Sequence, residues 1–348
     1  MAGEAGFKRV DAARLEALVS ELYVRAGVPA ANAARLSNAL VDADLRGVHS
    51  HGCRYVVGYL RSIRQGGLNG DPKIKTVRDD GATILLDGDG GIGHVVGYKG
   101  MELAIERARQ YGTGTVVIRN NGHCGALAYF TQLAADSGCL GYASTCGGSV
   151  MIPPGGREKV CGLNPLSWAA PTSRPWSLNL DMATSVVAGS KLLVAQERGE
   201  KIPLGWAVDP DGNPTTDPVL GMQGGLLPLG GPKGYGLSVM LDVTSGVLSG
   251  GRFGKGLGGK GSTMFIQAID IEHFIPLDQF KERTEQLIAQ IKGSALAPGS
   301  EGIFFPGEIE YNRKQDRLAH GIPLDAFVRG ELKREAEAAG LAYDIEIE

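Results

Sequence analysis

The residues best suited to proton transfer lie in the segment Arg46-Gly-Val-His-Ser-His-Gly52. Histidine is the side chain whose ordinary pKa lies near neutrality, so His51 can give a proton to a carbonyl or imine and take it back. The neighbouring hydroxyl of Ser50 can orient that imidazole or the substrate. We therefore predict that His51 and Ser50 are catalytic; packing of His51 against helix ends is the competing structural interpretation.

Four downstream clusters combine tight backbone with reactive side chains. His123 follows an expected strand and opens a helix, where free amides and its imidazole can meet an anion. Asp181 ends an extended run and can cap the next helix or accept from a ribose hydroxyl. Lys233 lies between glycines and suits a phosphate or carboxylate, although a surface lysine is the plain alternative. The clusters are Asn121-Gly-His123, Gly162-Leu-Asn-Pro165, Leu180-Asp-Met-Ala-Thr-Ser185 and Gly230-Gly-Pro-Lys-Gly-Tyr-Gly236.

Two patterns indicate rival chemistries at the same residues. His49, His51 and His123 are imidazoles that could bind zinc in a metal-dependent hydrolase, but no His or Cys pair at zinc spacing supports this. Cys124 is a candidate nucleophile, but nothing in its neighbourhood supplies an activating partner. A nucleotide-binding protein without catalytic activity is a further alternative.

Two glycine motifs resemble nucleotide loops. Gly88-Asp-Gly90-Gly-Ile-Gly93 matches the dinucleotide fingerprint between a strand and a helix, but the acidic residue expected about 20 positions later is absent. Arg119 could serve an NADP-type site there, and a tight turn is the alternative. Gly258-Gly-Lys-Gly261 hints at a P-loop, but no Ser or Thr follows the lysine to reach magnesium.

The expected elements place His51 in a turn between two helices. Hydrophobic periodicity predicts three helices in the first 70 residues, the first capped by Asp11, with His51 between the second and third. From about residue 76, strands and helices alternate, which predicts an α/β or α+β region. Residues 250–261 read as an exposed flexible loop. Strands are expected at 82–86, 114–118, 140–145, 166–170, 178–181 and 264–271, and helices at 95–110, 126–138, 184–198, 235–248, 277–292 and 324–339.

Composition points to a soluble cytoplasmic protein of about two domains. The chain has 348 residues, a net charge of −3 and no long basic block, so nucleic acid and membrane surfaces are poor partners. Five cysteines form no Cys-x-x-Cys pair, and no apolar run reaches the ~18 residues of a membrane span. We expect reduced thiols.

Taken in chain order, these clusters resemble the second type of malate/L-lactate dehydrogenase family, which is distinct from the Rossmann lactate dehydrogenases. That family also includes L-sulfolactate, ureidoglycolate and 2,3-diketogulonate oxidoreductases and Δ1-piperideine-2-carboxylate reductases. The matching segments are 46–52, 112–125, 162–171, 181–185, 202–218, 230–237 and 306–308.

The resemblance implies a homodimeric oxidoreductase that uses NAD or NADP, with NAD slightly favoured. It implies hydride transfer between nicotinamide and C2 of a small 2-oxo or 2-hydroxy acid, with reduction of a cyclic imine 2-carboxylate as the alternative. The implied fold is α+β. Residues 1–75 and 277–348 would form a helical substrate and dimerisation domain, and residues 76–276 a mixed-sheet, non-Rossmann cofactor domain. The 88–93 glycine motif is then a structural turn.

The resemblance also assigns site residues. His51 corresponds to the proton donor, and His123 to a wall shared by substrate and cofactor; no metal is implied. Further cofactor-binding residues are Asp181, Met182, Ala183, Thr184, Ser185, Pro232, Lys233, Gly307 and Glu308. Further substrate-binding residues are Arg46, Arg54 and Leu163.

Three departures from the family pattern put the substrate in question. Leu163 stands where Thr is usual, and Pro232 where His is frequent. Tyr55 stands where Arg is common, and Arg54 comes one position earlier, about 100° around a helix axis. The apolar Leu163 favours a ring or hydrophobic side chain over malate.

Overall fold

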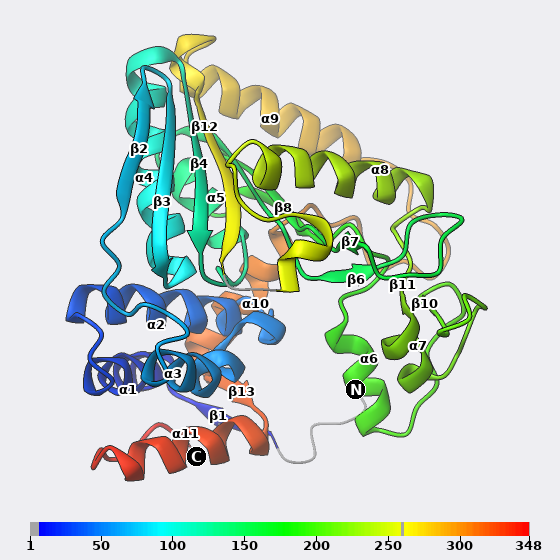
Figure 1. Ribbon diagram of the computed structural model, residues 1–348. Coiled ribbons are helices and arrows are strands. Elements are labelled where there is room, and N and C mark those ends of the chain that lie inside the picture. The colour runs from blue at the N-terminus through cyan, green and yellow to red at the C-terminus, as the bar shows by residue number, and fades with distance from the viewer. Residues whose placement is uncertain (1–6, 259–260, 348) are drawn as a thin grey trace.

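The two ends of the chain form a helical body in the computed structural model, which describes residues 7–258 and 261–347 (Figure 1). Asp11 caps the first helix by accepting from the Arg14 amide at 2.8 Å, as predicted. Leu15, Leu36 and Leu332 come from three different helices and share one core, so the C-terminal helix packs on the N-terminal ones. The body contains α1 (Ala12–Arg25), α2 (Ala30–Leu45), α3 (Val56–Arg64) and α11 (Ala326–Ala338), with the strand pair β1 (Lys8–Val10) and β13 (Ile322–Leu324).

A seven-stranded mixed sheet forms the second body. Its order is β2-β3-β4-β12-β5-β8-β9, and β3–β4 is the one parallel pair among its described strands. A doubly wound Rossmann sheet is mostly parallel, so the expected α+β, non-Rossmann fold is confirmed. The strands are β2 (Lys75–Asp80), β3 (Thr83–Gly91), β4 (Thr113–Asn121), β5 (Cys139–Thr145), β8 (Leu166–Ala170), β9 (Leu178–Met182) and β12 (Ser262–Asp270).

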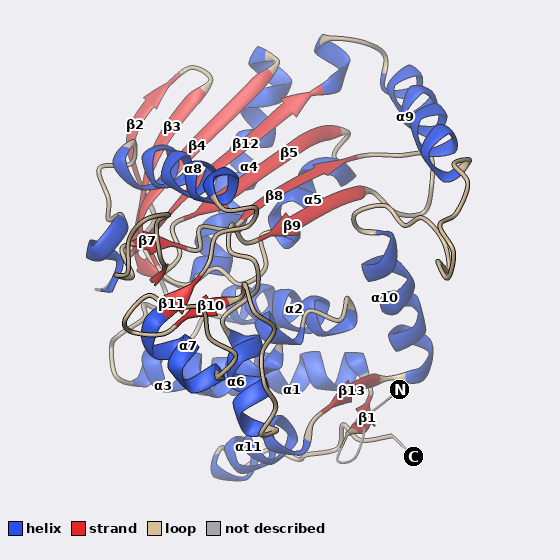
Figure 2. Ribbon diagram, turned by 90° about the vertical axis from the view of Figure 1, so that its right-hand side faces the viewer, coloured by secondary structure: helices blue, strands red, loops and turns tan. Residues whose placement is uncertain are grey.

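Helices cover both faces of this sheet (Figure 2). On one face lie α4 (Gly93–Tyr111), which connects β3 to β4, and α5 (Ala128–Asp136). On the other lies α8 (Pro232–Leu241), continued by a π-helical turn η3 (Asp242–Val247). A Cβ at Gly93 would lie 2.3 Å from the carbonyl oxygen of His123, and one at Gly91 would lie 2.5 Å from Pro72. The 88–93 glycines therefore allow a close strand-to-helix turn.

A smaller four-stranded sheet lies beside the main one, with its own apolar core around Leu192, Ile202 and Leu226. It contains β6 (Ser149–Met151), β7 (Cys161–Gly162), β10 (Ala207–Val208) and β11 (Gly225–Leu226), together with α6 (Ser190–Glu197) and α7 (Pro218–Gly224).

The segment after the main sheet is shared between the bodies. We expected residues 277–348 to return to the helical body. Instead α9 (Leu277–Lys292) buries Ile288 against Trp176 and Phe305 (Figure 1). The next helix, α10 (Glu308–His320), contacts α2 and was not predicted from the sequence. The return to the helical body therefore begins at α10.

Other local expectations are met or shifted. The helix expected from 184 begins at Ser190, because the hydroxyls of Thr184 and Ser185 bond backbone carbonyls of Leu163 and Val187 at 2.9 and 2.8 Å. In the expected 250–261 loop, Gly254–Gly258 forms a 3-10 turn, while residues 259 and 260 of the P-loop-like motif lie outside the described residues. No helix in the described part of the chain is long and apolar enough to cross a membrane.

Candidate active site

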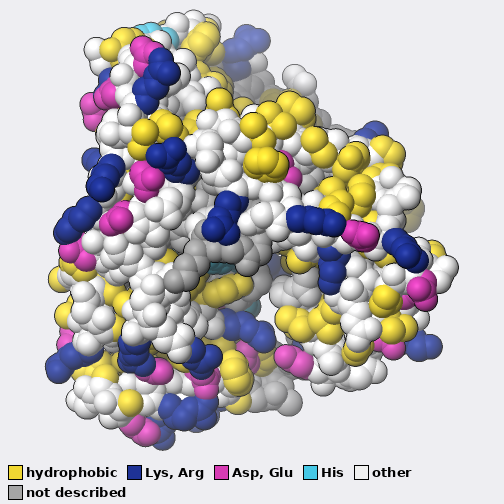
Figure 3. Space-filling model, in the orientation of Figure 1, with side chains coloured by type: hydrophobic (Ala, Val, Ile, Leu, Met, Phe, Trp, Pro, Cys, Tyr) yellow, Lys and Arg dark blue, Asp and Glu magenta, His cyan; other side chains and the backbone are white. Residues whose placement is uncertain are grey.

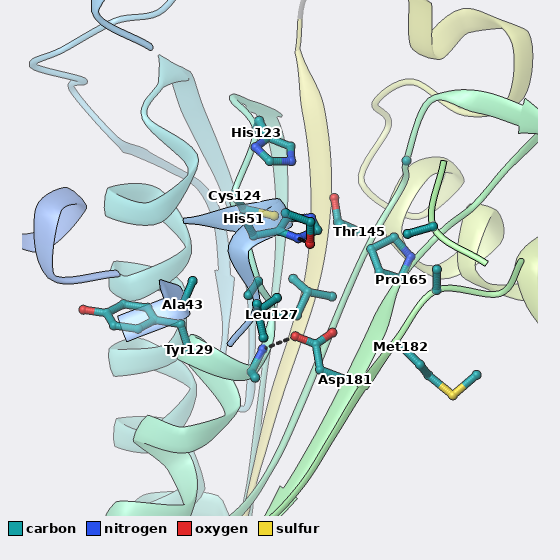
Figure 4. Close-up of a pocket in the computed structure, with 18 of the residues that line it drawn as sticks. Ala43, His51, His123, Cys124, Leu127, Tyr129, Thr145, Pro165, Asp181 and Met182 are labelled. Carbon is teal, nitrogen blue, oxygen red and sulfur yellow. Dashed lines mark hydrogen bonds between the residues drawn. The ribbon is translucent and has the colours of Figure 1, made fainter. Parts of the chain in front are cut away.

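A cavity of about 640 Å³ lies where the helical body meets the main sheet. Its wall combines residues of α2, the turn after it, the β4–α5 loop, β5, β9 and the start of α10. The volume is typical of a site for a small molecule or part of a cofactor. Figure 4 shows His51, His123 and Cys124 together at one end of the cavity, and Asp181 below them beside Leu127.

His51 reaches this cavity from a 3-10 turn, η1 (His49–His51), that follows α2. Its Nδ1 lies 2.9 Å from the Ser50 hydroxyl oxygen, so the predicted catalytic pair is in contact. Burial lowers the pKa of His51 below its ordinary value. The imidazole is therefore uncharged at neutral pH, and its Nε2 is the nitrogen left for a reacting group.

Asp44 anchors the turn that carries His51. Its carboxylate is 1% exposed and accepts from the Cys53 amide and from His49 Nδ1, both at 2.7 Å. Gly52 packs directly on it, since a Cβ there would lie 2.2 Å from Asp44 Oδ1. Sequence reasoning missed Asp44; the signal was an acidic residue in the last turn of a helix before a glycine-rich turn.

His123 forms the wall above His51, with ring centroids 5.9 Å apart. The Tyr59 hydroxyl is hydrogen-bonded to His123 Nδ1, and the Tyr55 ring stacks on the imidazole at 5.0 Å. Burial, and to a smaller extent the proximity of His51, lowers the pKa of His123 to about 4. The end of the cavity that contains His51 is thus lined by uncharged rings. Tyr55 and Tyr59 were not predicted as site residues, although a step of four places these two on one face of the helix that follows His51.

Asp181 projects into the cavity from β9. It caps α5 by accepting from the Ala128 amide at 2.8 Å, rather than beginning a helix of its own as we expected. Desolvation by the surrounding cavity wall raises the pKa of Asp181 to about 6, against the opposing effects of the Ala128 amide and the charge of Arg46. The side chain itself is exposed to the cavity, so its carboxylate offers a hydrogen-bond acceptor there.

The two candidate substrate arginines are separated by the fold. Arg46 lines the cavity, with a side chain 11% exposed and NH1 3.9 Å from Asp42 Oδ2. Arg54 lies outside it, with a side chain 42% exposed and NH2 3.7 Å from Glu197 Oε1. Tyr55 lines the cavity instead of Arg54, because successive residues of a helix lie about 100° apart around its axis.

The other expected site residues divide into two groups. Those that line the cavity are Leu163, Met182, Ala183 and Gly307. Those that do not are Thr184, Ser185, Pro232, Lys233 and Glu308. Thr184 and Ser185 are buried, and their hydroxyls bond backbone carbonyls. Pro232 and Lys233 are exposed at the start of α8. The Glu308 carboxylate pairs with Lys292 and accepts from the Phe305 amide at 3.0 Å.

The geometry does not favour the rival chemistries. His51 and His123 line the cavity, whereas His49 does not and bonds Asp44 through its Nδ1. No cluster of three His, Cys, Asp or Glu suited to a metal occurs in the described ranges. Burial raises the pKa of the Cys124 thiol to about 12, which makes it a poor nucleophile at neutral pH.

Comparison with known proteins reveals similarity along almost the whole chain. A sequence profile of the malate/L-lactate dehydrogenase family matches residues 10–333. Malate dehydrogenase of Pyrococcus horikoshii is 43% identical over 347 residues, which cover 96% of each chain. L-sulfolactate dehydrogenase of Methanocaldococcus jannaschii is 38% identical over 95% of this chain and 97% of that protein. Ureidoglycolate dehydrogenase (NAD(+)) of Escherichia coli is 35% identical over 91% of this chain and 92% of that protein.

Solved structures agree with this similarity. The crystal structure of malate dehydrogenase from Entamoeba histolytica matches with a TM-score of 0.93 and 30% identity, over 97% of this chain and 99% of the other. That of Δ1-piperideine-2-carboxylate reductase from Pseudomonas syringae matches with a TM-score of 0.83 and 28% identity, over 95% of this chain and 99% of the other.

Proposed function

This chain belongs to the malate/L-lactate dehydrogenase family, and we propose that it is an NAD(P)-dependent oxidoreductase. The proposed reaction takes place at C2 of a small 2-hydroxy or 2-oxo acid, since the relatives named above are dehydrogenases of several small acids. The observation that carries this proposal is the Ser50–His51 pair, which presents an imidazole to a cavity that also contains Arg46. Together they supply a proton-transfer group and a cation for a carboxylate.

The lining residues fit a nicotinamide cofactor. A Cβ at Gly148 would meet nothing within 4 Å, so the backbone there faces open space, and Asp181 supplies an acceptor. We propose that His123, Asp181, Met182, Ala183 and Gly307 hold the cofactor. When bound, it supplies or accepts the hydride. NAD is proposed before NADP, because a relative 35% identical to this chain is named for NAD(+).

His51 moves the proton at Nε2, because Nδ1 is bonded to Ser50. In oxidation of a hydroxy acid, the uncharged imidazole takes the hydroxyl proton. In reduction, it must first bind a proton, and its lowered pKa then makes it a strong donor. Arg46 has donors for a bidentate contact with the substrate carboxylate, which fixes the substrate's orientation.

Steady-state kinetics of His51→Ala tests this role. We expect turnover to fall by at least about 100-fold, the typical range for loss of general acid–base catalysis. Affinity for NADH, measured by fluorescence titration, should change little. His320→Ala removes an exposed imidazole on α10 and serves as the control. Near-normal turnover of His51→Ala would remove His51 from the mechanism, and NADH binding without oxidation by any 2-oxo acid or imine would indicate a non-catalytic nucleotide-binding protein.

Reduction of a cyclic imine 2-carboxylate is a second candidate. It is supported by the match to Δ1-piperideine-2-carboxylate reductase, and the same His51 proton would go to the ring nitrogen. NAD(P)H oxidation in the presence of Δ1-piperideine-2-carboxylate, compared with pyruvate, separates the two reactions.

We also propose a homodimer. Exposed apolar side chains run along α8 and η3, and Figure 3 shows such side chains gathered over this region. Patches of this kind often mark protein interfaces. They include Leu237, Met240, Val243, Val247 and Leu248. The molar mass measured by light scattering should be that of a dimer for the wild type and should fall toward that of a monomer for Met240→Asp.

We further propose a reducing, cytoplasmic location, which the five free, buried cysteines support.

A further inference from the structure

We propose that the substrate is a 2-oxo or 2-imino monocarboxylate whose carbon chain beyond C2 is apolar, and that Tyr55 and Leu163 select it. This inference rests on the function proposed above. Relatives of this chain are named for malate, sulfolactate and ureidoglycolate, so family membership leaves the group attached to C2 undetermined.

Uncharged rings surround the proton-transfer group. The Tyr55 ring lies 6.2 Å from that of His51 and 5.5 Å from that of Tyr59, and it stacks on His123. With a pKa of about 4, His123 carries no charge at neutral pH. A substituent on the carbon next to C2 therefore meets aromatic surface, which favours apolar groups over anionic ones.

The charges in the cavity suit one carboxylate. Among the described residues that line it, Arg46 is the one Arg or Lys, whereas Asp42, Asp181 and Glu310 are acidic. Arg54 faces Glu197 outside the cavity. A second substrate carboxylate would lie unpaired near these acids, and an unpaired charge in an enclosed site is strongly unfavourable.

Leu163 adds an apolar surface to the cavity wall. Its side chain packs over the backbone of Gly147, with Cδ1 3.2 Å from the position of a Cβ there. Its backbone carbonyl is already used by the amide and hydroxyl of Thr184, so the exposed contribution of Leu163 is its isobutyl group. Each substrate methylene buried on such a surface raises kcat/KM by about tenfold or more.

The test compares kcat/KM for oxaloacetate, pyruvate, 4-methyl-2-oxopentanoate, phenylpyruvate and Δ1-piperideine-2-carboxylate, each with NADH and NADPH. We expect at least one apolar substrate to exceed oxaloacetate by at least about tenfold. Comparison of the four 2-oxo acids with Δ1-piperideine-2-carboxylate distinguishes ketone reduction from imine reduction. A preference for oxaloacetate overturns the selectivity but leaves the proposed function standing. No turnover of any compound with either cofactor overturns both.

Tyr55→Arg then tests the residue directly. A guanidinium beside His123 should raise kcat/KM for oxaloacetate relative to 4-methyl-2-oxopentanoate by at least about tenfold. Tyr111→Arg is the matched control, because Tyr111 is 46% exposed at the far end of α4. In Leu163→Thr, kcat/KM for 4-methyl-2-oxopentanoate should fall more than that for pyruvate, which keeps the test valid if Tyr55→Arg does not fold. An unchanged substrate ratio in a folded variant at either position overturns the assignment of that residue.

Discussion

Replacing Gly52 by Ala tests whether the Asp44 anchor positions His51. Gly52 has a φ of −93°, outside the left-handed region that favours glycine, and the Asp44 carboxylate occupies the space that a side chain would need. The added Cβ would lie 2.2 Å from Asp44 Oδ1 and 2.5 Å from Oδ2, whereas ordinary contacts begin at 3.4 Å. The turn or the carboxylate must therefore move by about 1.2 Å to reach 3.4 Å.

Both consequences can be given a size. Hydrogen bonds to charged groups contribute ~1.5–3 kcal/mol each, so losing those from Cys53 and His49 lowers the free energy of unfolding by roughly 3–6 kcal/mol. A displacement of about 1 Å at the catalytic group lowers turnover by ~10²-fold. Denaturant unfolding and steady-state kinetics measure the two effects separately.

Gly58→Ala is the matched control, because a Cβ at Gly58 in α3 meets nothing within 4 Å. It should stabilise the protein by roughly 0.5–1 kcal/mol, as Gly→Ala does in helices, and leave turnover unchanged. In Asp44→Ala/Gly52→Ala the overlapping carboxylate is gone, so the double variant should resemble Asp44→Ala alone. Additive losses, or a Gly52→Ala protein with wild-type stability and turnover, would refute the reasoning.

Three further predictions follow from the site. Arg46→Gln should raise KM for 2-oxo acids about 10- to 100-fold, whereas the surface variant Arg54→Gln should change it by less than about twofold; equal effects would reject the assignment. Because burial lowers the pKa of His51, kcat/KM for oxidation should rise with pH through a midpoint below the ordinary histidine value of 6.5, and that for reduction should fall over the same range. Burial, with smaller effects of His123 and His51, lowers the pKa of buried His94 to about 3, so the unfolded chain binds a proton there first as the pH falls. The stability contributed by the uncharged His94 imidazole is present above about pH 6.5 and is lost as the pH falls toward 3. The free energy of unfolding of His94→Phe should therefore decrease less between pH 6.5 and 4 than that of the wild type.

Local structure was predictable because its causes are local. The Asp11 cap and the apolar faces of the first three helices depend on residues a few positions apart, and the structure has these elements nearly as expected. The contact between Ser50 and His51, the pair we propose as catalytic, was predictable for the same reason, since the two residues are adjacent. The 100° offset between Arg54 and Tyr55 was also readable from helical geometry.

What the sequence by itself determined is therefore the set of reactive residues and the short elements that carry them. Only the tertiary structure decided which of them meet. Packing of the β4–α5 loop against the turn after α2 brings His123 to His51 and Tyr55, and the seating of β9 beside α5 makes Asp181 a cap for a helix 53 residues earlier in the chain. These contacts depend on burial between distant segments, and no pattern within one segment encodes that burial.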